Sequence, residues 1–189
     1  VQEGMFVPQL TGLYQSLLPH HTLSLDVVGY STPEDFPSLA QAFPRSVGQY
    51  HHRFKLGGYK IFLDGSPQGR TAWLRRPYED AGDYCGYPTL TDSQVYDAFC
   101  LAVRQKRQIL AHCNGDAACE QMISAAERAI QNGYDVPSIR PVMIHAQILG
   151  RDQLPRLKSV GILPSFFLAH IYHWGDVHWN NLGPDRAQF

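Results

Sequence analysis

The sequence contains few charged residues. Asp, Glu, Lys and Arg make up 17% of its 189 residues, and the formal net charge is −1, whereas soluble proteins usually carry about 25% charged residues. Nucleic-acid-binding proteins usually display a basic stripe or patch. The densest basic runs here, Arg104–Arg107 and Arg75–Arg76, are short and flanked by acidic or apolar residues. We therefore expect no nucleic-acid partner, and the composition favours a buried, multilayer fold.

The four cysteines do not form a recognisable metal or disulfide motif. None is spaced as CxxC, and their positions match no zinc finger. Cys100 and Cys119 fall on apolar faces of expected helices, where a free cysteine behaves as a small hydrophobic residue. Because disulfides are rare in reducing compartments, we favour a cytoplasmic location, with disulfides between these cysteines as the alternative.

The sequence also lacks a long apolar segment. Its longest apolar stretch, near Ile162–Ile171, contains Pro164, Ser165 and His170, and it is too short and too polar to span a bilayer. The opening VQEGMFVPQL has neither the basic nor the apolar part of a signal peptide. We expect no membrane association. Because the chain starts at Val1 rather than at a methionine, we also expect that a longer parent protein carries residues before it.

Apolar strand-like segments alternate with helical patterns along the chain. Strands are expected at Leu23–Gly29, Tyr59–Leu63, Gln108–His112, Pro141–His145 and Gly161–Phe167. Helices are expected to begin at Thr32, Thr91, Asn114 and Asp152, with a long loop over residues 66–90 and an irregular tail over 169–189. Such alternation predicts parallel βαβ units. Since a (β/α)8 barrel needs about 250 residues, five strands fit either part of a barrel or an open α/β sheet.

Two histidines end consecutive expected strands, His112 and His145. In parallel α/β folds, functional groups gather at the carboxyl ends of the strands. Imidazole is a good zinc ligand, and a hydrolytic zinc keeps one position for a water molecule whose pKa it lowers. The spacing therefore indicates a metal site. The alternative is a pair of ordinary hydrogen-bonded histidines, because the chain contains nine.

Lys60 lies inside an apolar strand, YKIFL, where its ammonium group would be buried. Burial of an unpaired charge is costly, so such a lysine loses its proton or finds a partner. A neutral lysine amine can take up carbon dioxide and form a carbamate, whose oxygen atoms can bridge two metal ions. The alternative is an ion pair with Asp64 or a neighbouring carboxylate.

Four segments resemble amidohydrolase family 3, the YtcJ-like metal-dependent hydrolases that have N-substituted formamide deformylase as a relative. In chain order they are GGYKIFLDGSPQGRTAWLRRPY, LAHCNGDAACEQMISAAERA, RPVMIHAQILGRDQLPRLKSVGILPSFFLAHIYHWGD and LGPDRA. The matches run from about Leu56 to Ala187, whereas residues 1–50 match only weakly. We treat residues 1–189 as a single piece of one catalytic domain.

The resemblance implies an α/β fold, a partial TIM-like (β/α)8 metal-dependent hydrolase barrel of about strands 3 to 7. It further implies that Lys60 is a carboxylated bridging lysine, and that His112 and His145 are the metal ligands of strands 5 and 6. The cofactor would be one or two divalent ions, with zinc favoured. The substrate-binding candidates follow strands 4 and 7 and are Ser66, Gln68, Arg70 and His170.

The sequence departs from the family in several places. Nothing matches the HxH metal pair of the first strand, because His20–His21 and His51–His52 are adjacent pairs, and adjacent residues on a strand point to opposite faces. No segment follows Ala187 that could supply the catalytic Asp of the last strand. The Glu of the family's IEHAQ segment is Ile144 here. We therefore expect this piece to be catalytically silent alone, to bind metal weakly or not at all, and to carry an unmodified Lys60.

The expected activity of the parent is hydrolysis of a C–N amide-type bond of a small molecule by metal-bound hydroxide. One alternative is a non-catalytic α/β binding module with the same fold. Another is an unrelated zinc enzyme with His170, His173 and His178 as ligands, although their spacing fits no compact helix or strand face. A partial barrel leaves two sheet edges unpaired, and unpaired edges tend to recruit another chain, so we expect homo-oligomers. The sequence does not indicate the substrate.

Overall fold

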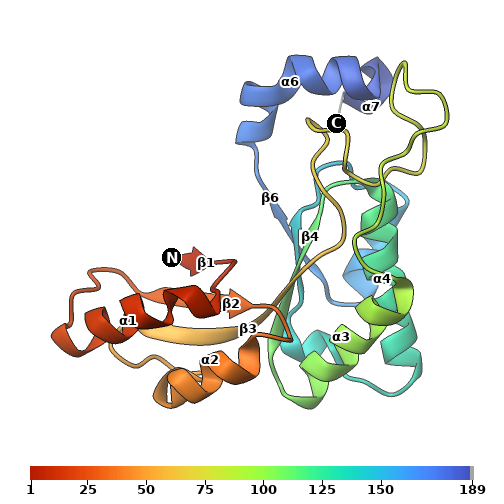
Figure 1. Cartoon of the computed structure of the whole chain (residues 1–189). Helices are drawn as coiled ribbons and strands as arrows, with labels where there is room; N and C mark the ends of the chain where they lie inside the picture. The colour runs from red at the N-terminus through yellow and green to blue at the C-terminus, as the bar shows by residue number, and fades with distance from the viewer. Residues whose placement is uncertain (188–189) are drawn as a thin grey trace.

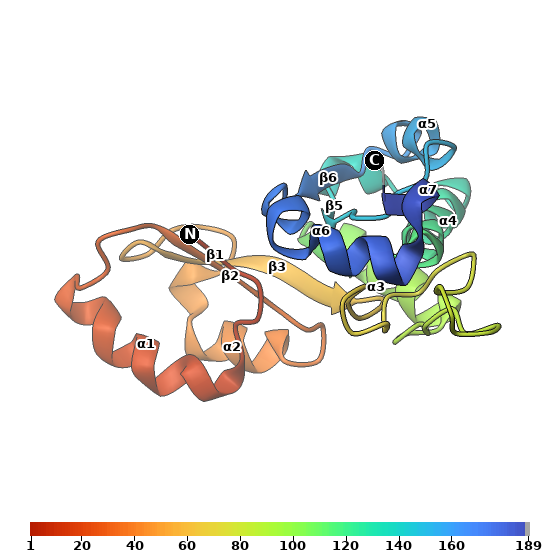
Figure 2. The ribbon, with the colours of Figure 1, turned by 90° about the horizontal axis from the view of Figure 1, so that it is seen from above.

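The computed structural model describes residues 1–187 and contains one wholly parallel sheet of six strands. The strand order in the sheet, β1 to β6, is also the order along the chain. In a doubly wound sheet the order reverses at a switch point, whereas in a (β/α)8 barrel it does not. The sheet curls, as Figures 1 and 2 show, and the prediction of a partial barrel is confirmed. The strands are β1 (Gln2–Glu3), β2 (Val27–Ser31), β3 (Phe54–Phe62), β4 (Gln108–Cys113), β5 (Val142–His145) and β6 (Leu163–Phe166).

Helices connect the strands. They are α1 (Thr11–Leu17), α2 (Phe36–Ala42), α3 (Asp92–Arg104), α4 (Asp116–Gln131), α5 (Gln153–Ser159), α6 (Ala169–Leu182) and α7 (Pro184–Ala187). Short 3-10 helices lie at Pro8–Leu10 (η1), Leu18–His20 (η2), Pro44–Ser46 (η3) and Val136–Ile139 (η4). The elements β1, β2, α1 and α2 lie to one side, and β3 runs from them to β4 (Figure 1). None of the described helices is long and apolar enough to cross a membrane.

The helix α3 begins where the sequence predicts. The Thr91 hydroxyl accepts from the Gln94 N–H at 3.3 Å, and the Gln94 side chain accepts from the Thr91 N–H at 2.9 Å. This reciprocal arrangement satisfies two donors that a helix start otherwise leaves free. The residues predicted for the apolar face are buried against the sheet: Val95, Ala98, Phe99 and Ala102.

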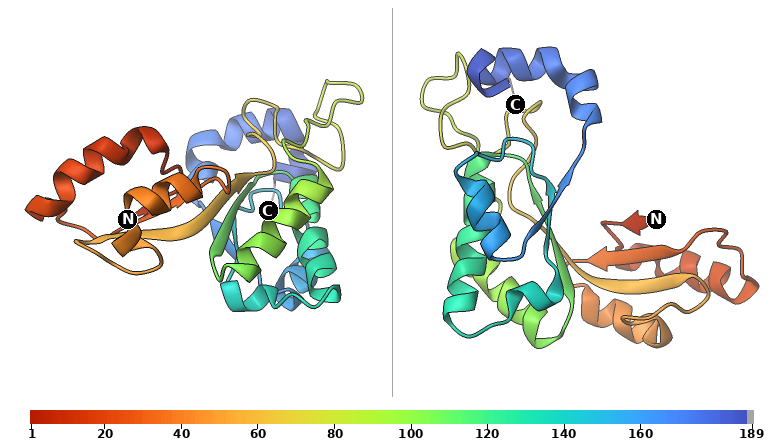
Figure 3. Two further views of the ribbon diagram at one scale, coloured as in Figure 1. Left: turned by 60° about the horizontal axis from the view of Figure 1, so that its bottom comes forward. Right: turned by 180° about the vertical axis from the view of Figure 1, so that it is seen from behind.

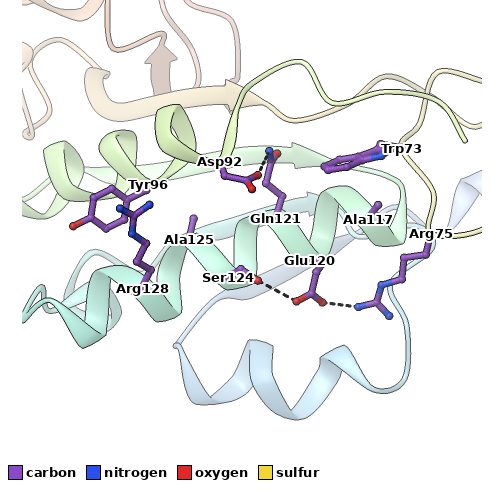
Figure 4. Close-up of a pocket in the computed structure, with 10 residues that line it drawn as sticks. All are labelled: Trp73, Arg75, Asp92, Tyr96, Ala117, Glu120, Gln121, Ser124, Ala125 and Arg128. Atoms are coloured by element: carbon purple, nitrogen blue, oxygen red, sulfur yellow. Dashed lines mark hydrogen bonds and ion pairs between the residues drawn. The ribbon is translucent and has the colours of Figure 1, made fainter.

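Helices α3 and α4 pack against each other on the outer side of the sheet (Figure 4). The Gln121 amide donates to Asp92 at the start of α3 over 2.8 Å, and the Arg128 guanidinium lies 4.1 Å from the centre of the Tyr96 ring. Polar and cation–π contacts therefore join two helices that also pack through apolar residues.

The tail is helical, and the expectation of an irregular segment is wrong. Residues 169–182 form α6, which lies across the carboxyl ends of the strands (Figure 3). The helix is held by the loop of residues 66–90, because Asn181 accepts from the Arg70 guanidinium at 3.0 Å and donates to the Pro67 carbonyl at 2.9 Å. A small buried cluster adds apolar contact between loop and helix: Leu74, Tyr78, Ile148 and Leu182. The partners of α6 come from distant segments, so its own sequence gives little sign of them.

The sheet also differs from expectation at its ends. A sixth strand, β1, precedes the five expected ones, and the expected strand at 23–29 is shifted to Val27–Ser31. Strand β6 is an edge of the sheet and contains Pro164, which suits an edge because proline cannot donate a ladder hydrogen bond. Phe166, the last residue of β6, and Phe167, which follows it, are 56% and 55% exposed. Self-association through such an edge stays a prediction.

Gly115 is expected to resist substitution. It precedes α4, and a Cβ atom there would lie 1.9 Å from the Trp73 carbonyl oxygen. Because the clash is with backbone, we expect Gly115→Ala to destabilise the chain by about 1 to 3 kcal/mol. The matched control is Gly12→Ala in α1, where nothing lies within 4 Å of the added atom and alanine favours the helix. Urea unfolding of both variants measures the difference, and equal stabilities would contradict the predicted clash.

Candidate metal centre

The three predicted metal ligands lie on three successive strands, β3, β4 and β5, toward the carboxyl ends of these strands. The rings of His112 and His145 have centroids 4.7 Å apart. Phe62 links them to Lys60, because its ring lies 5.4 Å from the His112 ring and its centre lies 4.9 Å from the Lys60 Nζ atom. The two imidazoles therefore lie side by side, and the Phe62 ring contacts both His112 and the Lys60 amine.

The backbone at the end of β5 turns His145 toward this region. The strand register pairs His145 with Cys113, a buried residue whose sulfur contacts Met122 of α4. Regular pleating would place the His145 side chain on that same helical side. Instead, His145 and Ala146 both have positive φ values, 73° and 46°. Few non-glycine residues adopt this conformation, and it is enriched at functional sites.

His112 is oriented by a hydrogen bond to the loop after β3. Its Nε2 atom lies 2.9 Å from the Gly65 carbonyl oxygen. A carbonyl oxygen only accepts, so this contact favours a proton on Nε2 and a lone pair on Nδ1. The Asn114 amide nitrogen, which is 3.0 Å from Nε2, donates to the same carbonyl at 2.7 Å. Metal-binding histidines usually donate their other ring N–H to a carbonyl or a carboxylate in this way. The Nδ1 atom of His112 is thus the one suited to hold a metal ion.

Lys60 is buried, with 5% of its surface exposed, and burial lowers its pKa to about 8. At this pKa, about 10% of the amine is neutral at pH 7, several hundred-fold more than for an exposed lysine. No carboxylate among residues 1–187 forms an ion pair with Lys60, so the alternative of a Lys60–Asp64 pair is wrong. A partly neutral, unpaired amine is the form that can react with carbon dioxide.

Asp64 instead supports the backbone behind the centre. Its two carboxylate oxygens accept from the backbone N–H groups of Trp73, Asn114 and Gly115 at 3.0, 3.0 and 2.7 Å. These donors belong to the long loop and to the start of α4, so one side chain ties both to the end of β3. The His112 ring is 3.7 Å from the same carboxylate. Asp64 thereby fixes the loop whose Gly65 carbonyl orients His112.

Both histidines are kept neutral. Burial is the first cause that lowers the pKa of His145 to about 4, and the neighbouring His112, His170 and Lys60 lower it further. Burial also lowers the pKa of His112, against the hydrogen bond to Gly65. A neutral imidazole offers its lone pair to a cation. The donor chemistry at this position therefore fits a divalent metal ion with nitrogen ligands.

The predicted substrate-binding residues fall into two groups. His170 stacks against His145, with ring centroids 5.5 Å apart, and both line a largely apolar cavity of about 390 Å³ between β6, α6 and the end of β5. Gln68 lies 3.2 Å from His178, which lines the same cavity. Ser66 and Arg70 are engaged within the loop and with α6 instead.

Sequence reasoning missed Gln147 and the place of His178. The Gln147 amide nitrogen is 2.8 Å from the His178 Nε2 atom, and its Oε1 atom is buried without a hydrogen-bond partner among the described residues. Both residues line the cavity beside His145. The signal for Gln147 was its place in the IHAQ segment, two residues after a candidate ligand. His178 was considered only as a member of a histidine cluster.

The alternative prediction of a zinc site formed by His170, His173 and His178 is wrong. These residues lie on a helix, and within residues 1–187 no three His, Cys, Asp or Glu side chains are placed to hold a metal ion. His173 is exposed and contacts the Tyr172 ring instead. The candidate centre at His112 and His145 differs because its predicted third ligand is a lysine, Lys60.

The chain is similar to known amidohydrolases. A sequence model of the Amidohydrolase family matches residues 6–189. The relative named "Putative amidohydrolase YtcJ" from Bacillus subtilis (strain 168) is 32% identical over 144 residues, which cover 71% of this chain and 25% of that protein.

Two solved structures share the fold. An uncharacterized metal-dependent hydrolase from Pyrococcus furiosus superposes with a TM-score of 0.83 at 24% identity, and one from Pyrococcus horikoshii OT3 with a TM-score of 0.79 at 23% identity. The alignments cover 98% of this chain, and 37% and 36% of those proteins. The chain thus spans about a quarter of YtcJ and just over a third of the two structures. By the extent of the family match and the shared barrel topology, this chain belongs to the amidohydrolase family.

Proposed function

We propose that this chain is part of a longer metal-dependent hydrolase that cleaves a C–N amide-type bond of a small molecule. The convergence of Lys60, His112 and His145 at the carboxyl side of three successive parallel strands carries this proposal. Family membership supports it. The share of each relative that the chain covers supports the view that further ligands come from other segments.

When bound, a divalent metal ion would polarise the substrate carbonyl and lower the pKa of a water molecule. His112 would hold the ion through Nδ1, while its Nε2–H stays on the Gly65 carbonyl. His145 would bind as a neutral imidazole. Lys60 would contribute an oxygen ligand as its carbamate. We favour zinc because the ligands are imidazoles.

The substrate would lie in the cavity that His145 and His170 share. The unpartnered Gln147 Oε1 atom could accept a hydrogen bond from an N–H group of the substrate. Gln68 would act through His178, whose position it fixes. The remaining candidates, Ser66 and Arg70, would keep the loop and α6 in place around the substrate.

Proton transfer to the leaving amine needs an acid–base group, and among residues 1–187 no carboxylate other than Asp64 pairs with His112 or His145. Asp64 is the near carboxylate, and three backbone N–H groups already occupy its oxygen atoms. We therefore assign the proton transfer to a residue outside this chain. It follows that the chain alone would hydrolyse no substrate, would bind metal weakly, and would carry Lys60 as a free amine.

Metal content and the mass of Lys60 test this proposal. The longer hydrolase, expressed with zinc and bicarbonate, is expected to contain at least one zinc ion per chain and a Lys60 peptide heavier by one carbon dioxide. The 189-residue chain should have an unmodified Lys60 and no tightly bound zinc that depends on His112. His112→Asn should lose zinc, and His173→Asn, at an exposed position on α6, should retain it. Ligand binding without metal in the longer protein would instead support a non-catalytic binding module. Tight, stoichiometric zinc in the isolated chain that is lost in His112→Asn would contradict the proposed division of ligands.

A further inference from the structure

A second group of histidines lies at the opposite edge of the sheet from the candidate metal centre. His21 follows η2 and leads toward β2, and His51 and His52 directly precede β3. The His21 and His52 ring centroids are 4.3 Å apart, and those of His51 and His52 are 4.0 Å apart. These residues therefore meet at the amino ends of two neighbouring strands, although thirty residues separate them in the chain.

The closest contact joins two nitrogen atoms. The Nδ1 atoms of His21 and His52 are 3.2 Å apart. Zinc–imidazole bonds are about 2.0 to 2.1 Å long, so one ion bonded to two nitrogens at 3.2 Å separation would subtend an angle of about 100°. That angle is close to the tetrahedral value. The pair is thus already spaced as two ligands of one ion.

The backbone holds both histidines in an unusual conformation. His21 and His52 have φ values of 53° and 50°, and Arg53 has 66°. Non-glycine residues rarely adopt positive φ, and those that do are enriched at functional sites. Local contacts fix the two segments relative to each other: the Arg53 carbonyl accepts from the Val27 N–H at 2.7 Å, and the Arg53 side chain pairs with Asp26 at 3.2 Å. The site is therefore largely formed before any ligand arrives.

We propose that His21 and His52 bind one divalent transition-metal ion through their Nδ1 atoms. Among residues 1–187 no three His, Cys, Asp or Glu side chains are arranged around one ion, so the site has two protein ligands and water completes it. His51 and His52 line a cavity of about 430 Å³ that can admit this water. Imidazole ligands suit copper, nickel and zinc, and the usual order of affinities places Cu²⁺ first.

Binding needs no net change in protonation. In the metal-free pair, one Nδ1–H donates to the Nδ1 lone pair of the other ring. When both rings carry their proton on Nε2, both Nδ1 lone pairs are free for the ion. Two coordinate bonds then replace one hydrogen bond, and each imidazole remains neutral.

Titration of the 189-residue chain with Cu²⁺, followed by calorimetry and electron paramagnetic resonance, tests the site. We expect one copper equivalent whose spectrum shows coupling to two imidazole nitrogens. His21→Ala and His52→Ala should each weaken this equivalent at least tenfold and remove one nitrogen coupling. The matched control is His20→Ala, an exposed neighbour outside the pair, which should leave the isotherm unchanged.

Any weaker copper binding at His112 and His145 would be unchanged by these substitutions, so failure at one site does not imply failure at the other. Circular dichroism in the presence of EDTA verifies that the variants remain folded. An unchanged isotherm and spectrum in the double variant His21→Ala/His52→Ala would overturn the proposal. An equal loss in His51→Ala would overturn the assignment of two ligands.

Discussion

Replacing Asp64 by alanine is expected to destabilise the chain by about 3 kcal/mol or more. Three backbone N–H groups, those of Trp73, Asn114 and Gly115, would lose their acceptor in a buried place. Each buried donor left without a partner costs about 1 to 3 kcal/mol. Equilibrium unfolding in urea measures the loss. We also expect the His112 ring to lose its fixed orientation, because Asp64 holds the loop that carries the Gly65 carbonyl.

An exposed aspartate provides the control for this variant. Asp26 forms an ion pair with Arg53, and both side chains are more than half exposed, at 56% and 57%. Exposed ion pairs contribute about 1 kcal/mol or less, so Asp26→Ala should change stability little. If the two substitutions had similar effects, the assignment of Asp64 as a buried backbone support would be wrong.

Asp64 should also make the folding stability of the chain depend on pH. Burial raises its pKa to about 6, against three hydrogen bonds that lower it. Because the folded pKa lies above the unfolded value, this group stabilises the fold fully below about pH 4, and the contribution is lost as the pH rises through 6. Two pKa units correspond to about 3 kcal/mol.

The contribution of His145 to folding stability has the opposite pH dependence, between about pH 4 and 6.5. Its folded pKa of about 4 lies below the ordinary value of histidine, so its contribution is lost as the pH falls from about 6.5 to 4. Comparison of wild type with Asp64→Asn isolates the aspartate, because the histidine is common to both. The stability difference between the two proteins should change between pH 4 and 6.5 and stay constant above pH 7.

Replacing His145 by alanine in the longer hydrolase should lower kcat/KM by roughly 1,000-fold, which corresponds to about 4 kcal/mol of transition-state stabilisation. The reason is the loss of a proposed metal ligand, whose ring centroid lies 4.7 Å from that of His112. Lys60→Ala should have a comparable effect. The measurement is hydrolysis of a panel of small amides, together with metal content.

Chemical rescue separates the role of Lys60 from a structural one. If Lys60 acts as a carbamate, a short carboxylic acid such as acetate should restore part of the activity of Lys60→Ala, because it supplies a similar oxygen ligand. Acetate should not restore His145→Ala. His173→Ala, on the exposed side of α6, should retain wild-type activity. Full activity of the Lys60 and His145 variants would contradict the proposed centre.

The sequence alone determined the family and the strands that carry the candidate ligands. Apolar segments that alternate with helical patterns give parallel βαβ units, and the positions of Lys60, His112 and His145 within them follow from the pattern. These features are local: strand length, capping residues such as Thr91, and apolar periodicity act within about ten residues. The resemblance to the amidohydrolase family covered the same segments and supplied the predicted roles of these three residues.

The tertiary structure decided what depends on distant contacts. The turn that brings His145 to His112 requires a positive φ at His145, which the sequence pattern does not predict. Helix α6 forms over the strand ends because Asn181 and Leu182 find partners in the loop of residues 66–90. The approach of His21 to His52 joins residues 31 positions apart in the chain. Such contacts depend on how the elements pack, and packing energies are properties of the assembled fold rather than of any one segment.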